Sequence, residues 1–537
     1  MSPGAQDSRI RRARQADRQT HSRWPLELVA KLPQMKSSVW IARLERLLTI
    51  LMVSLLAVLA ALRLAQCIAA LAETRQLDYY EGVVYDNAAR ILRTDMLYQP
   101  IDRAPYSVAA YMPSYLVLTA ALRAALGDGF GPGRALSVVA GLMTAYLVGR
   151  ITATRYGSRG PGAFAACLFL AISFPGEIPW MSLYRVDMLG VGFAMSSIAV
   201  LDNESASRRT VVAASLASLA ILTKQLLFGA GLAGLLWLLQ RDRKQAVLFG
   251  SIVLTIVGVT CAALELSTHA FLANTVYSNI NPIRADVLLA NLGIYWTFEV
   301  GPLIAATWYV LWRHPAKPHR DLVVLYWAAT FVPLIGMAKV GAYHNYWIES
   351  AAITAVLAAV AVWSAPPRAS RFTWRRANLG PPLVALAVGL FLAGPIVLGD
   401  ELVGASQLMT ASARNSAIAS VIARVRSEPS DVIAEPYDVV VLADRPVQLE
   451  TVIFSILFQA GRWDPQPMLD RICSGKIGLL VLSSPIEQAE NFSFYGVYWW
   501  PRPIIASLRV VMRLERVEAG RYLYTPRPSA SPADCPA

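Results

Sequence analysis

The chain has 537 residues, of which 55% are hydrophobic and only 16% are charged, and its formal net charge is +13. Because roughly a quarter of the residues of a soluble domain are charged, this composition excludes an ordinary soluble enzyme. The basic residues are concentrated in the N-terminal tail and in short segments between apolar runs. This placement is typical of the loops that fix the orientation of a membrane protein, and it argues against a nucleic-acid partner.

Apolar runs recur along the chain, and several are about as long as the ~20 residues that a helix needs to cross a bilayer. We therefore predict a polytopic α-helical membrane protein with about 11–12 membrane helices over residues 46–399. The basic, Ser- and Gln-rich residues 1–45 predict a disordered cytosolic tail, which precedes a first span near 47–72. An external loop over 73–110 is expected to follow this span.

The basic loops predict which side of the membrane each segment faces. The positive-inside pattern places four of them in the cytosol, at 205–209, 240–245, 312–320 and 366–376. Counting spans from the two ends of the chain gives conflicting positions for the basic loop at 150–159, because two apolar stretches, 111–126 and 135–149, precede it. One stretch must be re-entrant or interfacial, or this loop must lie outside. The sequence leaves open whether 111–126 crosses the membrane.

The last part of the chain, residues 400–537, has the pattern of a small extracytoplasmic α/β domain. The apolar runs at 438–446 and 477–484 are typical of short buried strands, and amphipathic helices are expected around them. Cys473 and Cys535 lie in this part and could form a disulfide if it is outside the cell.

The first carboxylates that could carry chemistry follow the first span, in LDYYEGVVYDNAARIL, and they are Asp78, Glu81 and Asp86. Asp78 and Glu81 have the spacing of a capping box, in which the glutamate accepts a hydrogen bond from the N-cap amide, so they could simply begin a helix. In the alternative interpretation, Glu81 is a general base at the mouth of a cavity, where apolar walls would raise its pKa.

Two further polar pairs interrupt apolar runs. Arg185 and Asp187 open the run YRVDMLGVGFAMSSIAVL, and they are not expected to pair with each other because residues two apart on a helix do not face one another. Lys224 and Gln225 divide a long apolar run, which predicts two short helices meeting at this turn. The two cations could extend to the membrane surface or bind a lipid phosphate, and Asp187 could bind a hydroxyl or a metal.

The segment AYHNYWIES places His344, Asn345, Tyr346 and Glu349 between two apolar runs. His344 and Glu349 could bind a metal, although a single loop histidine more often forms a hydrogen bond. Aromatic rings and an amide suit a sugar, because rings stack on sugar faces and amides bond to hydroxyls. No group of Cys and His has the spacing of zinc ligands.

In the order of these motifs the chain resembles the GT-C glycosyltransferases, in particular the bacterial family-39-like branch, which is similar to the dolichyl-phosphate-mannose mannosyltransferases. The motifs are DYYEG after the first span, DMLYQP and AYMPSYLVL before the next apolar stretch, LYRVDMLG at a helix start, ILTKQ and AYHNYWIE. The resemblance covers most of residues 45–400 and implies a GT-C-like membrane domain followed by the extracytoplasmic α/β domain.

The resemblance implies a role for each candidate residue. The acid of the first external loop is the catalytic base of this family, which implies that role for Glu81. The family pattern is Asp-Glu, whereas Tyr80 precedes Glu81 here, so the usual catalytic aspartate is missing. Glu81 or Asp78 must take its place, and Asp86 is the third candidate for the base. Binding of the donor phosphate is implied for Lys224 and Arg185. The cavity and substrate site is implied to include Asp187, Gln225, Tyr98, His344, Asn345, Tyr346 and Glu349.

The implied reaction is an inverting transfer of a sugar from a polyprenyl-phosphate-linked donor to an extracytoplasmic acceptor, which is a lipid, a glycan or a protein. Such an enzyme is expected in the bacterial cytoplasmic membrane, among its lipids, with a cytosolic N-terminus. It needs no nucleotide outside the cell, and a divalent cation is compatible with the site but not required. The alternative from another class is a lipid or solute transporter, or flippase, with an external domain, although we detect no internal repeat of the kind that transporters often have.

Overall fold

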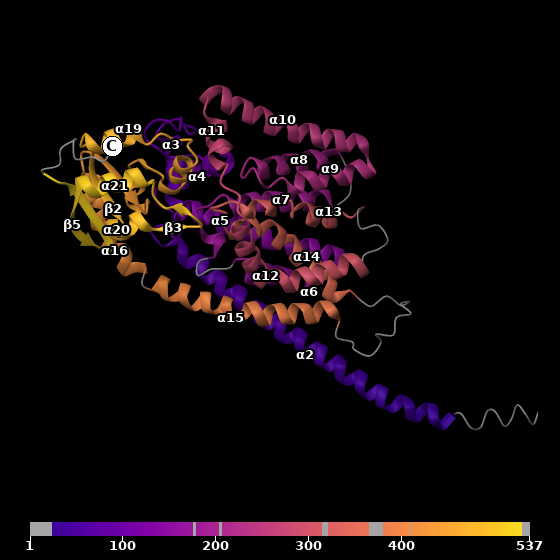
Figure 1. Cartoon of the computed structure of the whole chain (residues 1–537). Coiled ribbons are helices and arrows are strands. Elements are labelled where there is room, and N and C mark those ends of the chain that lie inside the picture. The colour runs from indigo at the N-terminus through magenta and orange to yellow at the C-terminus, as the bar shows by residue number, and fades with distance from the viewer. Residues whose placement is uncertain are drawn as a thin grey trace, which may run out of the picture.

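The computed structural model describes residues 24–174, 179–202, 207–313, 320–364, 380–409 and 411–528. Helices dominate the first three quarters of the chain, and the small sheet lies at one end of them (Figure 1). The helices of this part are α2 (Trp24–Leu71), α3 (Glu81–Leu92), α4 (Pro113–Leu126), α5 (Gly131–Tyr156), α6 (Arg159–Ile172), α7 (Asp187–Leu201), α8 (Ser207–Ile221), α9 (Gly229–Arg241), α10 (Arg243–Thr268), α11 (Phe271–Thr275), α12 (Ala285–Trp308), α13 (Leu322–Ala329), α14 (Ile348–Trp363) and α15 (Pro381–Met409).

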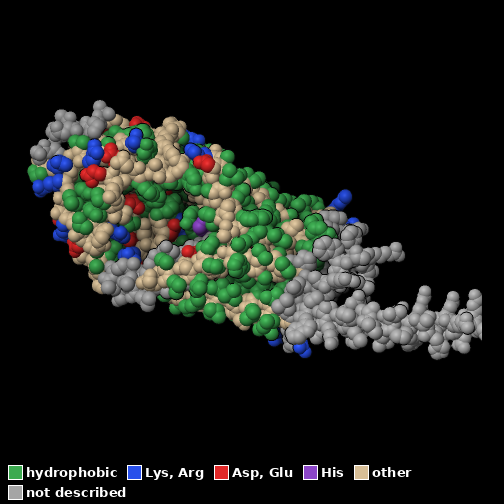
Figure 2. Space-filling model, turned by 60° about the horizontal axis from the view of Figure 1, so that its bottom comes forward, with side chains coloured by type: hydrophobic (Ala, Val, Ile, Leu, Met, Phe, Trp, Pro, Cys, Tyr) green, Lys and Arg blue, Asp and Glu red, His purple; other side chains and the backbone are tan. Residues whose placement is uncertain are grey.

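The helical part has the composition of a membrane domain. Five helices of the described residues, within α2, α5, α10, α12 and α15, are long and apolar enough to cross a bilayer, and five shorter apolar helices accompany them. Their outward side chains form a band of hydrophobic surface (Figure 2). The predicted polytopic helical membrane protein is therefore confirmed.

Two local predictions about this part can be compared with the structure. The apolar run around Lys224 is divided as expected, because α8 ends at Ile221 and α9 begins at Gly229. The stretch 111–126 forms α4, which has 14 residues and is therefore about 21 Å long at 1.5 Å per residue. This is shorter than the roughly 30 Å of a bilayer core, so α4 alone cannot cross it as a straight helix.

The C-terminal part is a small α/β unit, as predicted. Its main sheet has the strand order β1-β2-β6-β5, in which β1 and β2 are parallel and the other pairs are antiparallel. The elements are α16 (Ala411–Ser427), β1 (Asp431–Glu435), α17 (Asp438–Val441), α18 (Thr451–Gln459), α19 (Gln466–Cys473), β2 (Ile477–Leu482), α20 (Ile486–Asn491), β3 (Ser493–Phe494), β4 (Val497–Tyr498), α21 (Arg502–Val511), β5 (Met512–Glu518) and β6 (Arg521–Pro526).

One of the two predicted strands in this unit is wrong. The run 477–484 contains β2, whose residues are mostly buried, as expected. The run 438–446 instead begins with the helical turn α17, and the preceding residues Asp431–Glu435 supply the parallel edge strand. A short buried run has no periodicity that separates a helix from a strand, so tertiary packing decided between them. Cys473 is disulfide-bonded, and Cys535 lies outside the described residues.

The two parts of the chain are joined by backbone pairing. Tyr106, between α3 and α4, forms a parallel bridge with Leu449, and the Val108 amide donates to Oε2 of Glu450 at 3.0 Å. Glu450 is buried, and burial raises the pKa of its carboxyl to about 8. The segment 93–112 and the C-terminal unit therefore form a continuous structure at one end of the membrane helices.

Candidate active site

A cavity of about 700 Å³ lies between the membrane helices and the C-terminal unit. Its charged lining residues are Asp78, Arg185, Lys224 and Lys339, all from the membrane part. The C-terminal wall is formed by α18 and the region of the β3–β4 hairpin, with apolar and aromatic side chains only. Figure 2 shows a hollow between the mixed-charge end of the molecule and the hydrophobic band. The size lies within the range of small-molecule sites.

Asp78, in the loop between α2 and α3, is the carboxylate that faces this cavity. Its side chain is 18% exposed, and its Oδ2 accepts hydrogen bonds from Nη1 of Arg185 at 2.8 Å and from the Tyr80 amide at 3.1 Å. Burial raises the pKa of Asp78 above its usual value, although the Arg185 guanidinium opposes this shift. A carboxylate with a raised pKa, open to a cavity, can accept a proton from a bound hydroxyl.

Arg185 is held from several sides. Its Nη2 donates to the Tyr111 hydroxyl at 3.1 Å, and its guanidinium carbon lies 5.0 Å from the ring centroid of Tyr80 and 5.1 Å from that of Trp180. Cation–π contacts at these distances stabilise a buried guanidinium. Arg185 is therefore fixed beside Asp78 at the cavity wall.

Asp187 and Lys224 form a second ion pair near the cavity. Asp187 begins α7, and its Oδ1 is 2.6 Å from Nζ of Lys224 in the α8–α9 turn. The same carboxylate accepts hydrogen bonds from Nε1 of Trp180 at 2.9 Å and from Nδ2 of Asn345 at 2.9 Å. Arg185 and Asp187 thus have different partners, as their spacing predicted. Lys224 also lies 4.9 Å from the ring centroid of Tyr346.

Glu81 lies behind the loop and does not line the cavity. It is fully buried, and its Oε2 is 2.7 Å from Nη2 of Arg134 in α5. Its oxygens also accept hydrogen bonds from the amides of Tyr184 at 2.6 Å, Leu77 at 2.5 Å and Asp78 at 3.4 Å. The helix begins at Glu81 with Tyr80 at its N-cap, so Asp78 is not the N-cap residue that the capping box predicted. Glu81 still bonds to the Asp78 amide, and its contacts fix the backbone that carries Asp78.

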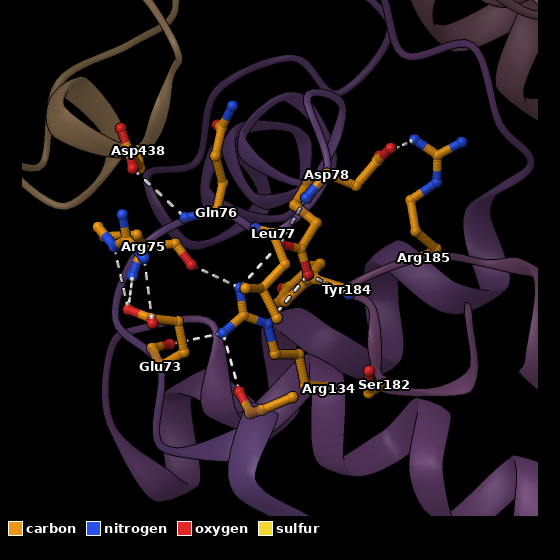
Figure 3. A network of polar contacts seen from close by, with 12 residues as sticks. Glu73, Arg75, Gln76, Leu77, Asp78, Arg134, Ser182, Tyr184, Arg185 and Asp438 are labelled. Carbon is orange, nitrogen blue, oxygen red and sulfur yellow. Dashed lines mark hydrogen bonds and ion pairs between the residues drawn. The ribbon is translucent and has the colours of Figure 1, made fainter. Parts of the chain in front are cut away.

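Arg134 fixes the rest of the same loop. Its Nη1 donates to the carbonyls of Ala70 and Glu73, at 3.1 and 2.5 Å, and its Nη2 donates to that of Arg75 at 2.6 Å. Figure 3 shows this guanidinium at the centre of the network, with Asp78 and Arg185 on the far side of the loop. One buried arginine therefore joins the end of α2, the loop and α5.

The C-terminal unit holds the same loop from the outside. The Gln76 amide donates to Oδ2 of Asp438 at 3.4 Å (Figure 3). The Tyr437 amide donates to Oε1 of Gln76 at 3.1 Å. The ring centroid of Tyr79 lies 5.2 Å from that of Trp499, which lines the cavity. The position of Asp78 therefore depends on both parts of the chain.

Two other candidates from the sequence lie away from the cavity. Asp86 is buried on α3, where its carboxylate pairs with Arg90 at 3.1 Å and with Arg93 at 2.9 Å. Tyr98 is buried and donates its hydroxyl to the carbonyl of Tyr111 at 3.0 Å. Neither residue is among the lining of the cavity.

The AYHNYWIES segment is divided between the cavity and the interior. Asn345 and Tyr346 line the cavity, as does Gln225, which donates to the Thr275 carbonyl at 3.2 Å. His344 is buried, with its ring stacked on that of Tyr343 at 3.9 Å between centroids. Glu349 is buried and accepts a hydrogen bond from Tyr326 at 3.0 Å.

The described part of the chain contains no group of three or more His, Cys, Asp or Glu side chains arranged to hold a metal. The carboxylate that faces the cavity, Asp78, is paired with a cation, and so is Asp187 behind it.

The chain is similar to known proteins in its structure but not in its sequence. No protein-family model and no curated protein sequence matches the chain. The crystal structure of ArnT from Cupriavidus metallidurans bound to undecaprenyl phosphate has a TM-score of 0.56 and 14% identity, over 88% of this chain and 98% of that one. The apo state of the same ArnT has a TM-score of 0.57 and 13% identity over the same shares. The chain has a GT-C fold.

The apo oligosaccharyltransferase of Archaeoglobus fulgidus is a more distant match, with a TM-score of 0.47 and 13% identity over 82% of this chain and 70% of that one. The likeness to ArnT extends over most of both chains, so this GT-C fold includes the C-terminal unit as well as the membrane helices. The fold that the motif order implied is therefore confirmed.

Sequence reasoning missed two contributions to the cavity of this GT-C fold. Lys339 lines it, although it lies three residues before the AYHNYWIES segment and was not among the predicted site residues. The aromatic wall from Phe494, Tyr495 and Trp499 was also missed, because it comes from the C-terminal unit. The cluster SFYGVYWW, which has unusually many rings, was the available signal.

Proposed function

We propose that this protein is a membrane glycosyltransferase that moves a sugar from a polyprenyl-phosphate-linked donor to an extracytoplasmic acceptor. The observation that carries the proposal is one cavity that combines the carboxylate Asp78 with the cations Arg185, Lys224 and Lys339. A transferase of this kind needs a base for the acceptor and positive charge for the leaving phosphate. The similarity to an ArnT structure that contains undecaprenyl phosphate supports the same class of donor.

Asp78 is the base in this proposal. Its carboxylate removes the proton from an acceptor hydroxyl, and the acceptor oxygen attacks the anomeric carbon of the sugar from the face opposite the phosphate. The bond between the anomeric carbon and the phosphate oxygen breaks, and its electron pair leaves with the polyprenyl phosphate. The configuration of the sugar is therefore inverted. The raised pKa of Asp78 supports this role, because it makes the carboxylate a stronger base.

The cations stabilise the charge that develops on the phosphate. Arg185 is paired with Asp78 and Lys224 with Asp187, and these ion pairs hold the two cations in place. Preorganised charge of this kind stabilises a transition state without reorganisation during the reaction. Glu81 and Arg134 act behind them as positioning residues, because their contacts fix the loop that carries Asp78.

We also propose how the parts are placed in the cell. Residues 1–45 form a basic cytosolic tail, and residues 46–399 form the GT-C membrane domain with its external loop over 73–110. Residues 400–537 form an extracytoplasmic domain that completes the cavity. The short basic loops support this orientation in a bacterial cytoplasmic membrane. The acceptor is then an envelope glycan, lipid or protein.

A transfer assay tests the proposal. Purified protein in detergent is given a panel of polyprenyl-phosphate-linked sugars with cell-envelope extract as the acceptor, and release of free polyprenyl phosphate is followed together with labelled product. We expect release with at least one donor. No release from any donor, combined with movement of the intact lipid across the bilayer of reconstituted vesicles, would instead establish the transporter.

A further inference from the structure

The charged groups at the cavity are unevenly compensated. Arg185 is neutralised by Asp78 at 2.8 Å, and Lys224 is neutralised by Asp187 at 2.6 Å. The third cation, Lys339, forms no ion pair and no side-chain hydrogen bond with any described residue. The groups at this site therefore carry one uncompensated positive charge, and it resides on Lys339.

Lys339 also lies in an unfavourable place for a free cation. It is half-buried at the cavity wall, and burial, with a smaller contribution from the nearby Lys224, lowers the pKa of its amine below the usual value. Removing a charge from water without a partner costs free energy. An anion that enters the cavity would relieve that cost, so this side chain favours an anionic ligand more than a paired lysine does.

The backbone presents Lys339 in a fixed position. The Arg284 amide donates to the Ala338 carbonyl at 2.8 Å, and the Val340 amide donates to the Pro282 carbonyl at 3.0 Å, so the residues on both sides of Lys339 are paired with the chain before α12. Gly341 follows with a φ of 87°, a conformation that glycine adopts readily. The cation is therefore held on a structured turn.

We propose that Lys339 is the docking cation for the phosphate of the donor lipid, and that it engages this phosphate before Lys224 and Arg185 do. The inference rests on the proposed function and deepens it. A sugar linked to a polyprenyl chain through one phosphate is a phosphodiester with a single negative charge, which matches the single uncompensated charge at the site. Lys224 and Arg185 already have carboxylate partners, so they act on the charge that develops as the phosphate leaves.

The ligand chemistry is a phosphate, which could come from a lipid headgroup or from free phosphate in solution. Binding of undecaprenyl phosphate and of inorganic phosphate is measured by tryptophan fluorescence on the full chain in detergent. We compare wild type, Lys339→Met, which keeps an apolar stem of similar length, and Lys339→Arg, which keeps the charge. Lys476→Met is the control, because Lys476 is exposed and does not line the cavity.

We expect Lys339→Met to weaken undecaprenyl phosphate binding about 10-fold or more, and Lys339→Arg and Lys476→Met to stay within about 3-fold of wild type. Inorganic phosphate should bind far more weakly than the lipid. Wild-type affinity in Lys339→Met, at an unchanged thermal midpoint, would overturn the proposal, and so would inorganic phosphate that binds as tightly as the lipid.

The transfer assay separates this inference from the proposed function. With an active donor, we expect Lys339→Met to raise the donor KM about 10-fold or more while kcat falls much less, since a docking contact acts on donor capture. A wild type that transfers sugar and a Lys339→Met variant with an unchanged donor KM would refute only the role of Lys339. A wild type that releases polyprenyl phosphate from no donor would refute the proposed function itself.

Discussion

Replacing Glu81 should destabilise the protein more than it impairs any chemical step, because Glu81 is the centre of a buried network. Its ion pair with Arg134 is completely buried on both sides, and three backbone amides donate to the same carboxylate. Glu81→Ala leaves the Arg134 guanidinium buried without its carboxylate. Breaking a buried pair in this way costs about 3–5 kcal/mol.

The assay is thermal unfolding of the purified protein in detergent, followed by tryptophan fluorescence. Because the unfolding entropy grows with chain length, a loss of about 3–5 kcal/mol in a chain of 537 residues should lower the midpoint by roughly 3–4 °C. Asp78→Asn is the matched variant, because Asp78 lies in the same loop but is partly exposed and has fewer contacts. We expect Asp78→Asn to lower the midpoint by no more than about 1 °C.

The result that would refute this reasoning is the reverse pattern. If Glu81→Ala unfolds at the wild-type temperature and loses transfer completely, whereas Asp78→Asn transfers normally, Glu81 is the base and Asp78 belongs to the scaffold. Glu81→Gln adds a finer test, since the amide keeps the size of the side chain and removes its charge. It should fall between wild type and Glu81→Ala in thermal midpoint.

Three further outcomes are expected. Glu450 has a pKa raised by burial to about 8, so the folded state binds its proton more tightly than the unfolded state, and stability should fall as pH rises from about 5 to 8; Glu450→Gln should remove much of that fall in the thermal midpoint. Asp187→Asn and Lys224→Met should each lower the midpoint, and the double mutant should lower it by less than the sum of the two, because the side chains are in contact at 2.6 Å. A double mutant that lowers it by the full sum would show that the two residues are not coupled. Trp499→Ala, in the uncharged wall, should raise the KM for the acceptor several-fold and leave the KM for the donor nearly unchanged. Steady-state kinetics with each substrate varied in turn measure both constants. A raised KM for the donor alone would show that this wall binds the donor.

The sequence predicted the membrane class, the division around Lys224 and the cluster of polar groups at one end of the helices, because these features depend on local hydrophobicity. It also placed Arg185, Asp187 and Lys224 among the site residues, and the structure brings Arg185 and Lys224 to one cavity with Asp187 paired to Lys224 behind its wall. Polar groups next to apolar runs are costly unless they are paired, so their positions are informative even in a single sequence.

The sequence could not distinguish Asp78 from Glu81. Both lie in one short loop, and which of them faces the cavity depends on Arg134, which is 53 residues from Glu81 along the chain. Lys339 was missed for a related reason, since its significance comes from the carboxylates that neutralise the other two cations. The error at 438–446 arose because burial of a short apolar run is compatible with either a helix or a strand.

The most direct test of the central claim is the rate of polyprenyl phosphate release by Asp78→Asn with a donor that the wild type uses. Asp102→Asn is the control, because Asp102 is an exposed carboxylate between α3 and α4 and does not line the cavity. The account predicts a loss of about 100-fold or more in kcat for Asp78→Asn, as expected for removal of a general base, with Asp102→Asn unchanged and both variants folded. A folded Asp78→Asn protein that releases polyprenyl phosphate at the wild-type rate would contradict it.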